Sequence, residues 1–131
     1  MPENARKLKE LFLSHGGLII ASPEYNSSIS AALKNAIDWV SRSTSKDEPF
    51  LAAFDGKKAA LLAASPGGYG GARGLVQLRP LLENIKVTVI EPQITIPEAH
   101  DFINEDGTFA NEEIAGKVRN LGAALANAMR G

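Results

Sequence analysis

The sequence contains no cysteine. This absence excludes a disulfide framework, a zinc site built on thiolates and a cysteine nucleophile. No charge dominates either, because 14 basic residues are balanced by 15 acidic ones, which gives no electrostatic case for a nucleic-acid or membrane-surface partner. No apolar run approaches the roughly 20 residues that span a bilayer, and the N-terminus is too polar for a signal peptide. We therefore expect a soluble cytoplasmic protein.

The 131 residues suffice for one domain of ordinary size, which needs no metal or disulfide to hold it together. Repeats, low-complexity tracts and linker-like segments are also lacking, so we expect a single domain over residues 1–131.

Helical and extended patterns alternate along the chain. Apolar residues recur at helical spacing before Gly16, again after Ser30, which can cap a helix, then around Leu75, and finally after Asn111, a second capping residue. The apolar stripe of the helix near Ser30 comprises Ile29, Leu33, Ile37 and Val40, and that of the last helix comprises Ile114, Val118, Leu121 and Leu125.

Apolar runs at 18–20, 59–65 and 87–96 separate these helices and predict strands. The run at 18–20 is continuous, which predicts a strand that is buried on both faces, as in a parallel sheet covered by helices. The last run alternates near its end, so we expect it at a sheet edge. We expect residues 41–49 to form a surface loop, and residues 103–109 to form a turn between short extended pieces. Pro80 predicts a kink or an early end of the third helix near residues 77–79.

This alternation predicts an α/β domain with a parallel sheet and helices on both faces. Ligands of such sheets bind beyond the carboxyl ends of the strands. Two unusual turns, residues 23–26 and 65–71, follow directly after predicted strands. Both turns should therefore lie at the ligand-binding edge.

The second turn, "SPGGYGG", holds four glycines before a helix. Glycine allows a ligand to approach the backbone closely, and free N–H groups at a helix start favour an electron-rich partner. The first turn, "PEYN", offers a fixed φ at Pro23, a flat amphipathic ring at Tyr25 and a turn-forming Asn26. Each turn can also be a purely structural connection. Together they favour a shallow crevice for a flat heteroaromatic ligand.

The segments "SPEYNSSISAALKNAIDWVSR" and "ALLAASPGGYGGARGLVQLRPLL" resemble the NADPH-dependent FMN reductases, flavodoxin-like enzymes that include quinone, chromate and azo-dye reductases. The resemblance implies a flavodoxin-like domain with bound FMN, reduced by NADPH or NADH and reoxidised by a flavin, a quinone or a similar small acceptor. It also implies that the two turns contact the flavin, through Pro23, Glu24, Tyr25, Asn26, Ser65, Gly67, Gly68, Gly70 and Gly71.

No acid–base or metal constellation accompanies these turns. The two histidines, His15 and His100, pair with no nucleophile, and we expect them to be structural or solvent-exposed. A flavin supplies its own hydride chemistry, so no catalytic side chain and no metal ligand is predicted. Arg73 is interpreted as a solvated residue at a helix start, with a nucleotide contact as the alternative.

Members of the resembled family begin with a strand, a phosphate loop, a helix and a second strand, about 50 residues that have no match here. We expect the strand at 18–20 to keep an unpaired apolar edge. A truncated product, pairing with another copy, and evolutionary loss all remain open. We hypothesise weak FMN affinity, and the alternative function is a non-catalytic oligomeric remnant of the fold.

The helix after Ser30 has a second face, which carries Trp39 beside the small residues Ala32, Asn35 and Ala36. Aromatic residues are enriched in interface cores, and the resemblance implies that this helix takes part in a homodimer or homotetramer. The alternative is that Trp39 covers a loop of its own domain.

Overall fold

The computed structural model describes residues 1–131 and has the predicted α/β architecture. Three parallel strands, β1 (Gly17–Ala21), β2 (Lys58–Ala64) and β3 (Thr88–Ile96), form one sheet in the order β1-β2-β3. The helices are α1 (Glu3–Ser14), α2 (Ala31–Val40), α3 (Ala72–Asn84) and α4 (Glu112–Arg130), with the short 3-10 helix η1 (Ala99–Asp101) after β3. None of the helices is both long and apolar enough to cross a bilayer.

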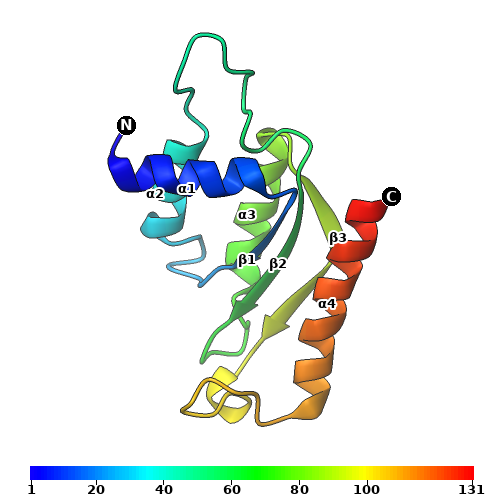
Figure 1. The fold of residues 1–131 in the computed structure, drawn as a ribbon. Helices are drawn as coiled ribbons and strands as arrows, with labels where there is room; N and C mark the ends of the chain where they lie inside the picture. Colours follow the sequence, from blue (N-terminus) through cyan, green and yellow to red (C-terminus); the bar gives the residue numbers. More distant parts are fainter.

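The sheet is covered on both faces, as a parallel sheet requires. In Figure 1, α4 runs along one face while α3 lies behind the strands with α1 and α2 on its side. Alternate residues of β2 serve the two layers. Ala59, Leu61 and Ala63 pack toward α3, whereas Ala60 packs against Leu121 and Leu125 of α4.

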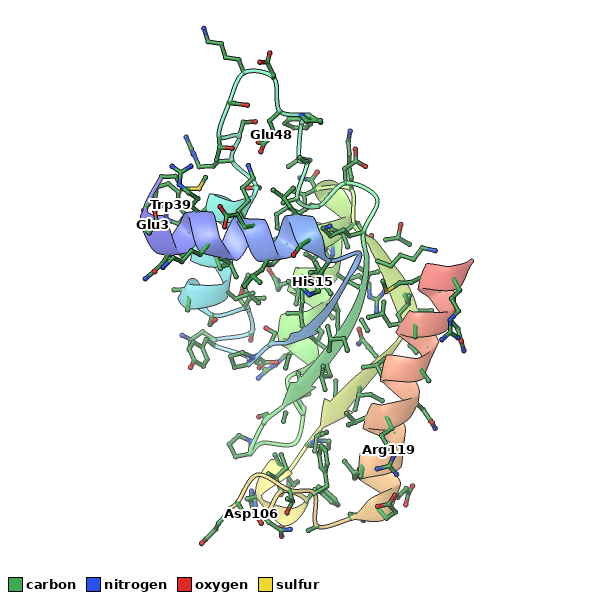
Figure 2. The ribbon with its side chains drawn as sticks, in the orientation of Figure 1. Glu3, His15, Trp39, Glu48, Asp106 and Arg119 are labelled. Atoms are coloured by element: carbon green, nitrogen blue, oxygen red, sulfur yellow. The ribbon has the colours of Figure 1, made fainter.

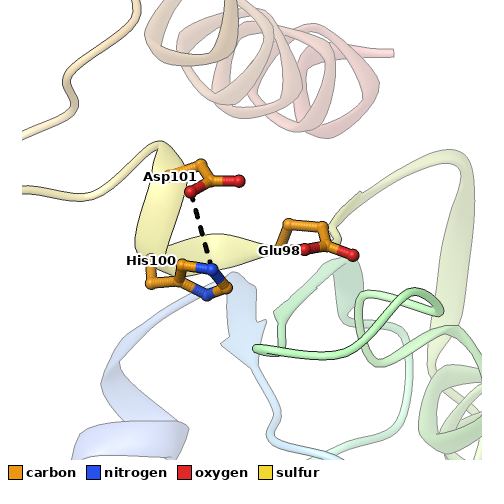
Figure 3. A group of neighbouring side chains, drawn as sticks. All are labelled: Glu98, His100 and Asp101. Atoms are coloured by element: carbon orange, nitrogen blue, oxygen red, sulfur yellow. Dashed lines mark ion pairs between the residues drawn. The ribbon is translucent and has the colours of Figure 1, made fainter.

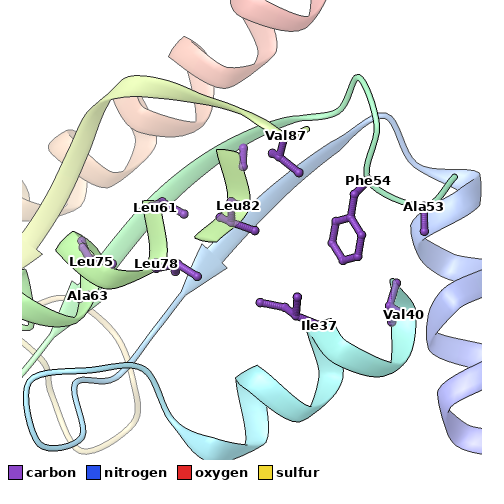
Figure 4. Close-up of a cluster of buried hydrophobic side chains, with 11 residues drawn as sticks. Ile37, Val40, Ala53, Phe54, Leu61, Ala63, Leu75, Leu78, Leu82 and Val87 are labelled. Carbon is purple, nitrogen blue, oxygen red and sulfur yellow. The ribbon is translucent and has the colours of Figure 1, made fainter. Parts of the chain in front are cut away.

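The larger core lies between the sheet, α2 and α3 (Figure 4). Leu75, Leu78 and Leu82 of α3 are fully buried against β2, and Ile37 and Val40 of α2 are buried beside them. Phe54, from the loop before β2, is completely buried in the same cluster and meets Phe12 of α1 edge to face, with ring centroids 5.4 Å apart. This loop therefore contributes to the core, a role that its sequence did not indicate.

Both predicted helix caps are confirmed. The Ser30 side chain accepts a hydrogen bond from Leu33 N–H at 3.1 Å. The Asn111 side chain accepts from the N–H groups of Glu113 and Ile114 at 2.8 and 3.3 Å. These bonds satisfy N–H groups that have no partner inside the helix and fix where α2 and α4 begin.

Of the two outcomes expected at Pro80, a kink or an early end of α3, the early end does not occur, because the helix continues to Asn84. The hydrogen bond that Pro80 cannot donate would have reached the carbonyl of Val76, four residues earlier. Both residues are exposed, so water can serve that carbonyl. Leu78 and Leu82, on either side of the proline, stay buried on the sheet and hold the helix in place.

The two edges of the sheet differ. β3 is an edge strand, as predicted, and its register with β2 is irregular between Ala59 and Leu61. Arg79 of α3 donates to the carbonyl of Ile90 at 3.0 Å and to the Gln93 side chain at 2.9 Å, which covers this irregular stretch. The charged Arg79 and the proline Pro92 within β3 both disfavour pairing of a further strand with the β3 edge.

The other edge, β1, pairs only with β2. The expectation that β1 is buried on both faces is wrong for Ile19, a residue that is 61% exposed because α4 packs mainly on β2 and β3. Leu11, one of the apolar residues at helical spacing before Gly16, is also exposed. The β1 side of the molecule is therefore the more apolar edge.

The predicted surface loop at 41–49 follows the C-terminal end of α2 and lies alongside α1 (Figure 1). Figure 2 shows Glu48 on the arm of this loop that extends past α1, and Trp39 beside the N-terminal part of α1. Ile103 and Phe109 form an isolated antiparallel bridge around the turn at Gly107, which confirms the predicted turn between short extended pieces.

Candidate functional site

The first turn is a miniature hairpin at the carboxyl end of β1. Tyr25 N–H donates to the Ser28 carbonyl at 2.9 Å, and Ser28 N–H donates back to the Tyr25 carbonyl at 3.1 Å. The two residues between them, Asn26 and Ser27, have φ of 53° and 66°. Two-residue hairpin turns of this kind need positive φ at both positions, which asparagine tolerates well and serine less so. The hairpin leaves the Tyr25 side chain 59% exposed.

The second turn follows β2 and is held against the end of β3. Ser65 N–H donates to the Ile96 carbonyl at 3.1 Å, and the Ser65 hydroxyl accepts from Gly67 N–H at 3.1 Å. Gly70 and Gly71 have φ of 62° and 87°. A Cβ at Gly71 would lie 2.5 Å from the Cβ of Ala63, and one at Gly70 would lie 2.7 Å from Pro97 N. Both positions therefore require glycine for sterics as well as for φ.

The second turn presents several unused hydrogen-bond donors. The backbone N–H groups of Gly68, Tyr69, Gly70 and Gly71 donate to no acceptor within the chain. Gly70 and Gly71 are buried residues, and buried N–H groups without a partner are rare in folded proteins. This stretch is therefore suited to bind an acceptor-rich edge of a ligand.

A single carboxylate connects the first turn to the start of α3, directly after the second turn. Glu24 Oε2 accepts hydrogen bonds from Nε and Nη2 of Arg73 at 3.0 and 2.7 Å, and Glu24 Oε1 accepts from Gly74 N–H at 3.2 Å. These bonds to Arg73 and Gly74 hold the pKa of Glu24 below its ordinary value. Arg73 is exposed at the start of α3, as the sequence indicated, but its guanidinium is also bound by Glu24 and lies 4.4 Å from the centroid of the Tyr69 ring.

An apolar pocket of about 300 Å³ opens at the same edge of the sheet. It lies where the three strands end, and the Ile103–Phe109 bridge borders it from the segment after β3. Its lining residues are Ala21, Ser22, Pro23, Leu62, Ala63, Ala64, Ile96, Ile103 and Phe109. Sequence reasoning missed the contribution of Ile103 and Phe109, and the turn around Gly107 was the available signal.

The structure thus brings the two predicted turns to one edge of the sheet. Nine residues were predicted to contact a cofactor. Pro23 lines the apolar pocket, the Glu24 carboxylate is hydrogen-bonded to the start of α3, and Tyr25 and Asn26 lie in the first hairpin. The other five form the second turn: Ser65, Gly67, Gly68, Gly70 and Gly71. Ser27 and Gly74 belong to the same constellation and were not identified, and the pairing of Arg73 with Glu24 was not predicted, because these roles depend on φ and on long-range contacts.

Both histidines are exposed, as expected. The His15 ring Nδ1 lies 2.7 Å from the Leu11 carbonyl at the end of α1. His100 Nε2 lies 3.5 Å from a carboxylate oxygen of Asp101, and Glu98 completes a cluster of polar side chains at η1 (Figure 3). All three residues of this cluster are open to solvent, so it has no shielded position for a ligand.

The chain is similar to proteins of a known family. The sequence profile of NADPH-dependent FMN reductases matches residues 1–101. An NAD(P)H-dependent FMN reductase of Pseudomonas aeruginosa is 34% identical over 113 residues, which are 86% of this chain and 58% of the relative. A 2-hydroxy-1,4-benzoquinone reductase of Burkholderia sp. is 31% identical over 113 residues, which are 86% of this chain and 59% of the relative.

A solved structure extends the similarity to the whole fold. FerB, a flavoenzyme NAD(P)H:(acceptor) oxidoreductase from Paracoccus denitrificans, superposes with a TM-score of 0.83 at 27% identity, over 98% of this chain and 69% of FerB. The chain spans less than two thirds of the length of the two relatives named above. Its profile match, sequence identity and superposition agree, and the chain belongs to the NADPH-dependent FMN reductase family.

Proposed function

We propose that the protein is an FMN-dependent NAD(P)H oxidoreductase, and that it passes reducing equivalents from NADPH or NADH to a flavin, a quinone or a similar small acceptor. One observation carries the proposal. Unpaired N–H groups of the second turn lie at the carboxyl edge of the sheet, beside the first turn and next to an apolar pocket. A flavin ring is flat, has apolar faces and carries acceptor atoms on one edge, so it matches both features.

FMN supplies the redox chemistry when it is bound, because its ring takes hydride from a nicotinamide and gives electrons to an acceptor. The chain itself binds and orients the ring. The N–H groups of Gly68, Gly70 and Gly71 would donate to acceptor atoms of the ring, and Pro23 and Tyr25 would form the apolar wall of the site. No side chain is assigned an acid or base role.

The two turns supply no free cation for the FMN phosphate. They contain no lysine, and the arginine next to them, Arg73, is already paired with Glu24. We therefore expect the ring to be bound more securely than the phosphate, with weak FMN affinity in the 131-residue chain. This observation also favours the second candidate function, a non-catalytic oligomeric protein that keeps the fold without holding FMN tightly.

A visible spectrum and an activity assay separate the two candidates. The purified protein should gain the yellow absorbance of bound flavin on addition of excess FMN, and it should then oxidise NADPH in the presence of a quinone. NADH measured in parallel would show which nicotinamide is preferred. No flavin binding and no NADPH oxidation at saturating FMN would contradict the enzyme proposal and support the non-catalytic candidate.

The quinone acceptor class is supported by the Burkholderia relative, whose name gives a quinone as its substrate. For this chain a small aromatic acceptor is proposed because the apolar pocket beside the two turns is lined mainly by aliphatic side chains. Comparing a quinone with free FMN as the acceptor in the same assay would decide between the two.

We further propose that the chain acts as one flavodoxin-like unit in the cytoplasm and associates as a homodimer or homotetramer through α2. Trp39 is half-buried, and the small residues Ala32, Asn35 and Ala36 lie along the same helix. Light scattering at micromolar concentration tests this assembly. A monomer whose mass is the same in the Trp39→Ala variant would contradict it.

A further inference from the structure

The hydrogen bonds that join the first turn to the second turn and the start of α3 all involve one side chain. Between residues 23–28 and residues 65–74, the chain makes three hydrogen bonds, and the Glu24 carboxylate accepts each of them. The Glu24 side chain is only 10% exposed although it lies in a surface turn. Its partners, Arg73 and Gly74, are in the first turn of α3, 49 and 50 residues away in sequence.

The geometry of this contact is specific to its residues. Nε and Nη2 of Arg73 both reach Oε2 of Glu24, a charge-assisted contact that a lysine ammonium cannot reproduce. The other carboxylate oxygen takes the N–H of Gly74, near the positive end of the α3 dipole, where Gly71 at the start of the helix offers no side-chain cap. A Cβ at Gly74 would lie 3.1 Å from the Ser28 carbonyl oxygen, so the start of α3 is in close contact with the first hairpin there.

The turns that this contact joins are conformationally demanding. Asn26 and Ser27 in the first turn and Gly70 and Gly71 in the second all have positive φ. Backbone of this kind persists only when the surrounding structure fixes it. The Arg73 guanidinium also lies over the Tyr69 ring, so the contact extends from Glu24 through Arg73 to the exposed aromatic residue of the second turn.

We propose that Glu24 and Arg73 are positioning residues, a clasp that fixes the separation and orientation of the two ring-binding turns without contacting the cofactor. That the clasp positions turns which bind a flavin rests on the proposed function, but the contact between Glu24 and Arg73 does not. It gives Glu24 a different role from the cofactor contact expected from the sequence. It also means that Arg73 is unavailable to bind a nucleotide phosphate as long as the clasp is closed.

Hydrogen exchange of the protein without cofactor tests the clasp directly. Three variants are compared with the wild type: Glu24→Gln, Arg73→Lys and their combination. Each single change should speed amide exchange roughly tenfold in both turns, including the turn that was not mutated, because a local opening costs less without the charge-assisted bonds. The double variant should add little to either single change, since both remove the same contact. Exchange in β2 and α4 should stay unchanged.

Lys34→Gln is the matched control, because it removes the exposed Lys34–Asp38 pair on α2 and should leave both turns unaffected. Normal exchange in the first turn of Arg73→Lys, or fully additive effects in the double variant, would overturn the clasp. FMN titration gives the second readout, in which each single variant should bind roughly tenfold more weakly than the wild type if the turns position the ring. A wild type that binds no FMN would refute the proposed function, while the exchange experiment would still decide the clasp.

Discussion

The Nζ atom of Lys9 lies 2.5 Å from Oε1 of Glu48 and 2.7 Å from Oε2. The same ammonium donates to the Arg42 carbonyl at 2.8 Å, and the Lys9 side chain is only 4% exposed. Glu48 also accepts hydrogen bonds from the backbone and the hydroxyl of Thr44. Lys9 therefore ties α1 to the long loop after α2, the loop that carries Phe54 into the core.

Removing this ammonium should destabilise the protein. Lys9→Met keeps most of the side-chain volume but leaves the Glu48 carboxylate and the Arg42 carbonyl without their donor. The expected loss in the free energy of unfolding is about 1–3 kcal/mol, the usual cost of leaving such groups unpaired. Urea denaturation would measure it, with the exposed Lys7→Met as the control. Equal stability of the two variants would contradict a structural role for the Lys9–Glu48 pair.

The same pair should make stability depend on pH. The hydrogen bond from Lys9, followed by those from Thr44, holds the pKa of Glu48 below its ordinary value. A carboxyl group with a lowered pKa in the folded state contributes stability above its unfolded pKa, about 4.3, and this contribution is lost as the pH falls through the folded pKa. The difference between wild type and Glu48→Gln should therefore be largest near neutral pH and shrink in acid. A difference that stayed constant down to pH about 3 would contradict this linkage.

Gly71→Ala should be strongly destabilising. Its φ of 87° is unfavourable for alanine, and the new Cβ would lie 2.5 Å from the Cβ of Ala63. Backbone strain and steric overlap together suggest a loss of about 2–4 kcal/mol in the free energy of unfolding. Gly68→Ala is the control three residues earlier, because a Cβ there meets no atom within 4 Å. Thermal or urea denaturation of both variants checks the contrast, and similar losses at both positions would contradict it.

The β1 edge should promote self-association of the chain. Ile19 is 61% exposed on a strand that pairs on one side only. Ile19→Lys places a charge on this edge and should lower the apparent mass at high protein concentration in light scattering. Val76→Lys is the matched control, since Val76 is 68% exposed but lies on α3, away from any strand edge. If both substitutions lowered the apparent mass equally, the added charge alone would explain the effect, and the β1 edge would have no special role.

Local sequence signals predicted most of the fold correctly. Ser30 and Asn111 placed the starts of α2 and α4, because capping depends on residues only two or three positions apart. Pro80 does not end α3, although an early end was one of the predicted outcomes. The cost of the hydrogen bond that a proline cannot donate depends on whether the acceptor carbonyl reaches water, and here that carbonyl belongs to an exposed residue. Ile19 was predicted to be buried and is exposed, since an apolar run does not show how far a neighbouring helix reaches across the sheet.

The sequence by itself determined the α/β order, the helix caps and the placement of two unusual turns at the carboxyl ends of strands, because each depends on residues close in the chain. Only the tertiary structure decided what holds those turns together. The Glu24–Arg73 and Lys9–Glu48 pairs join residues 49 and 39 positions apart. Their existence depends on how α3 and α1 dock on the sheet, and that docking results from burial of apolar surface over the whole molecule.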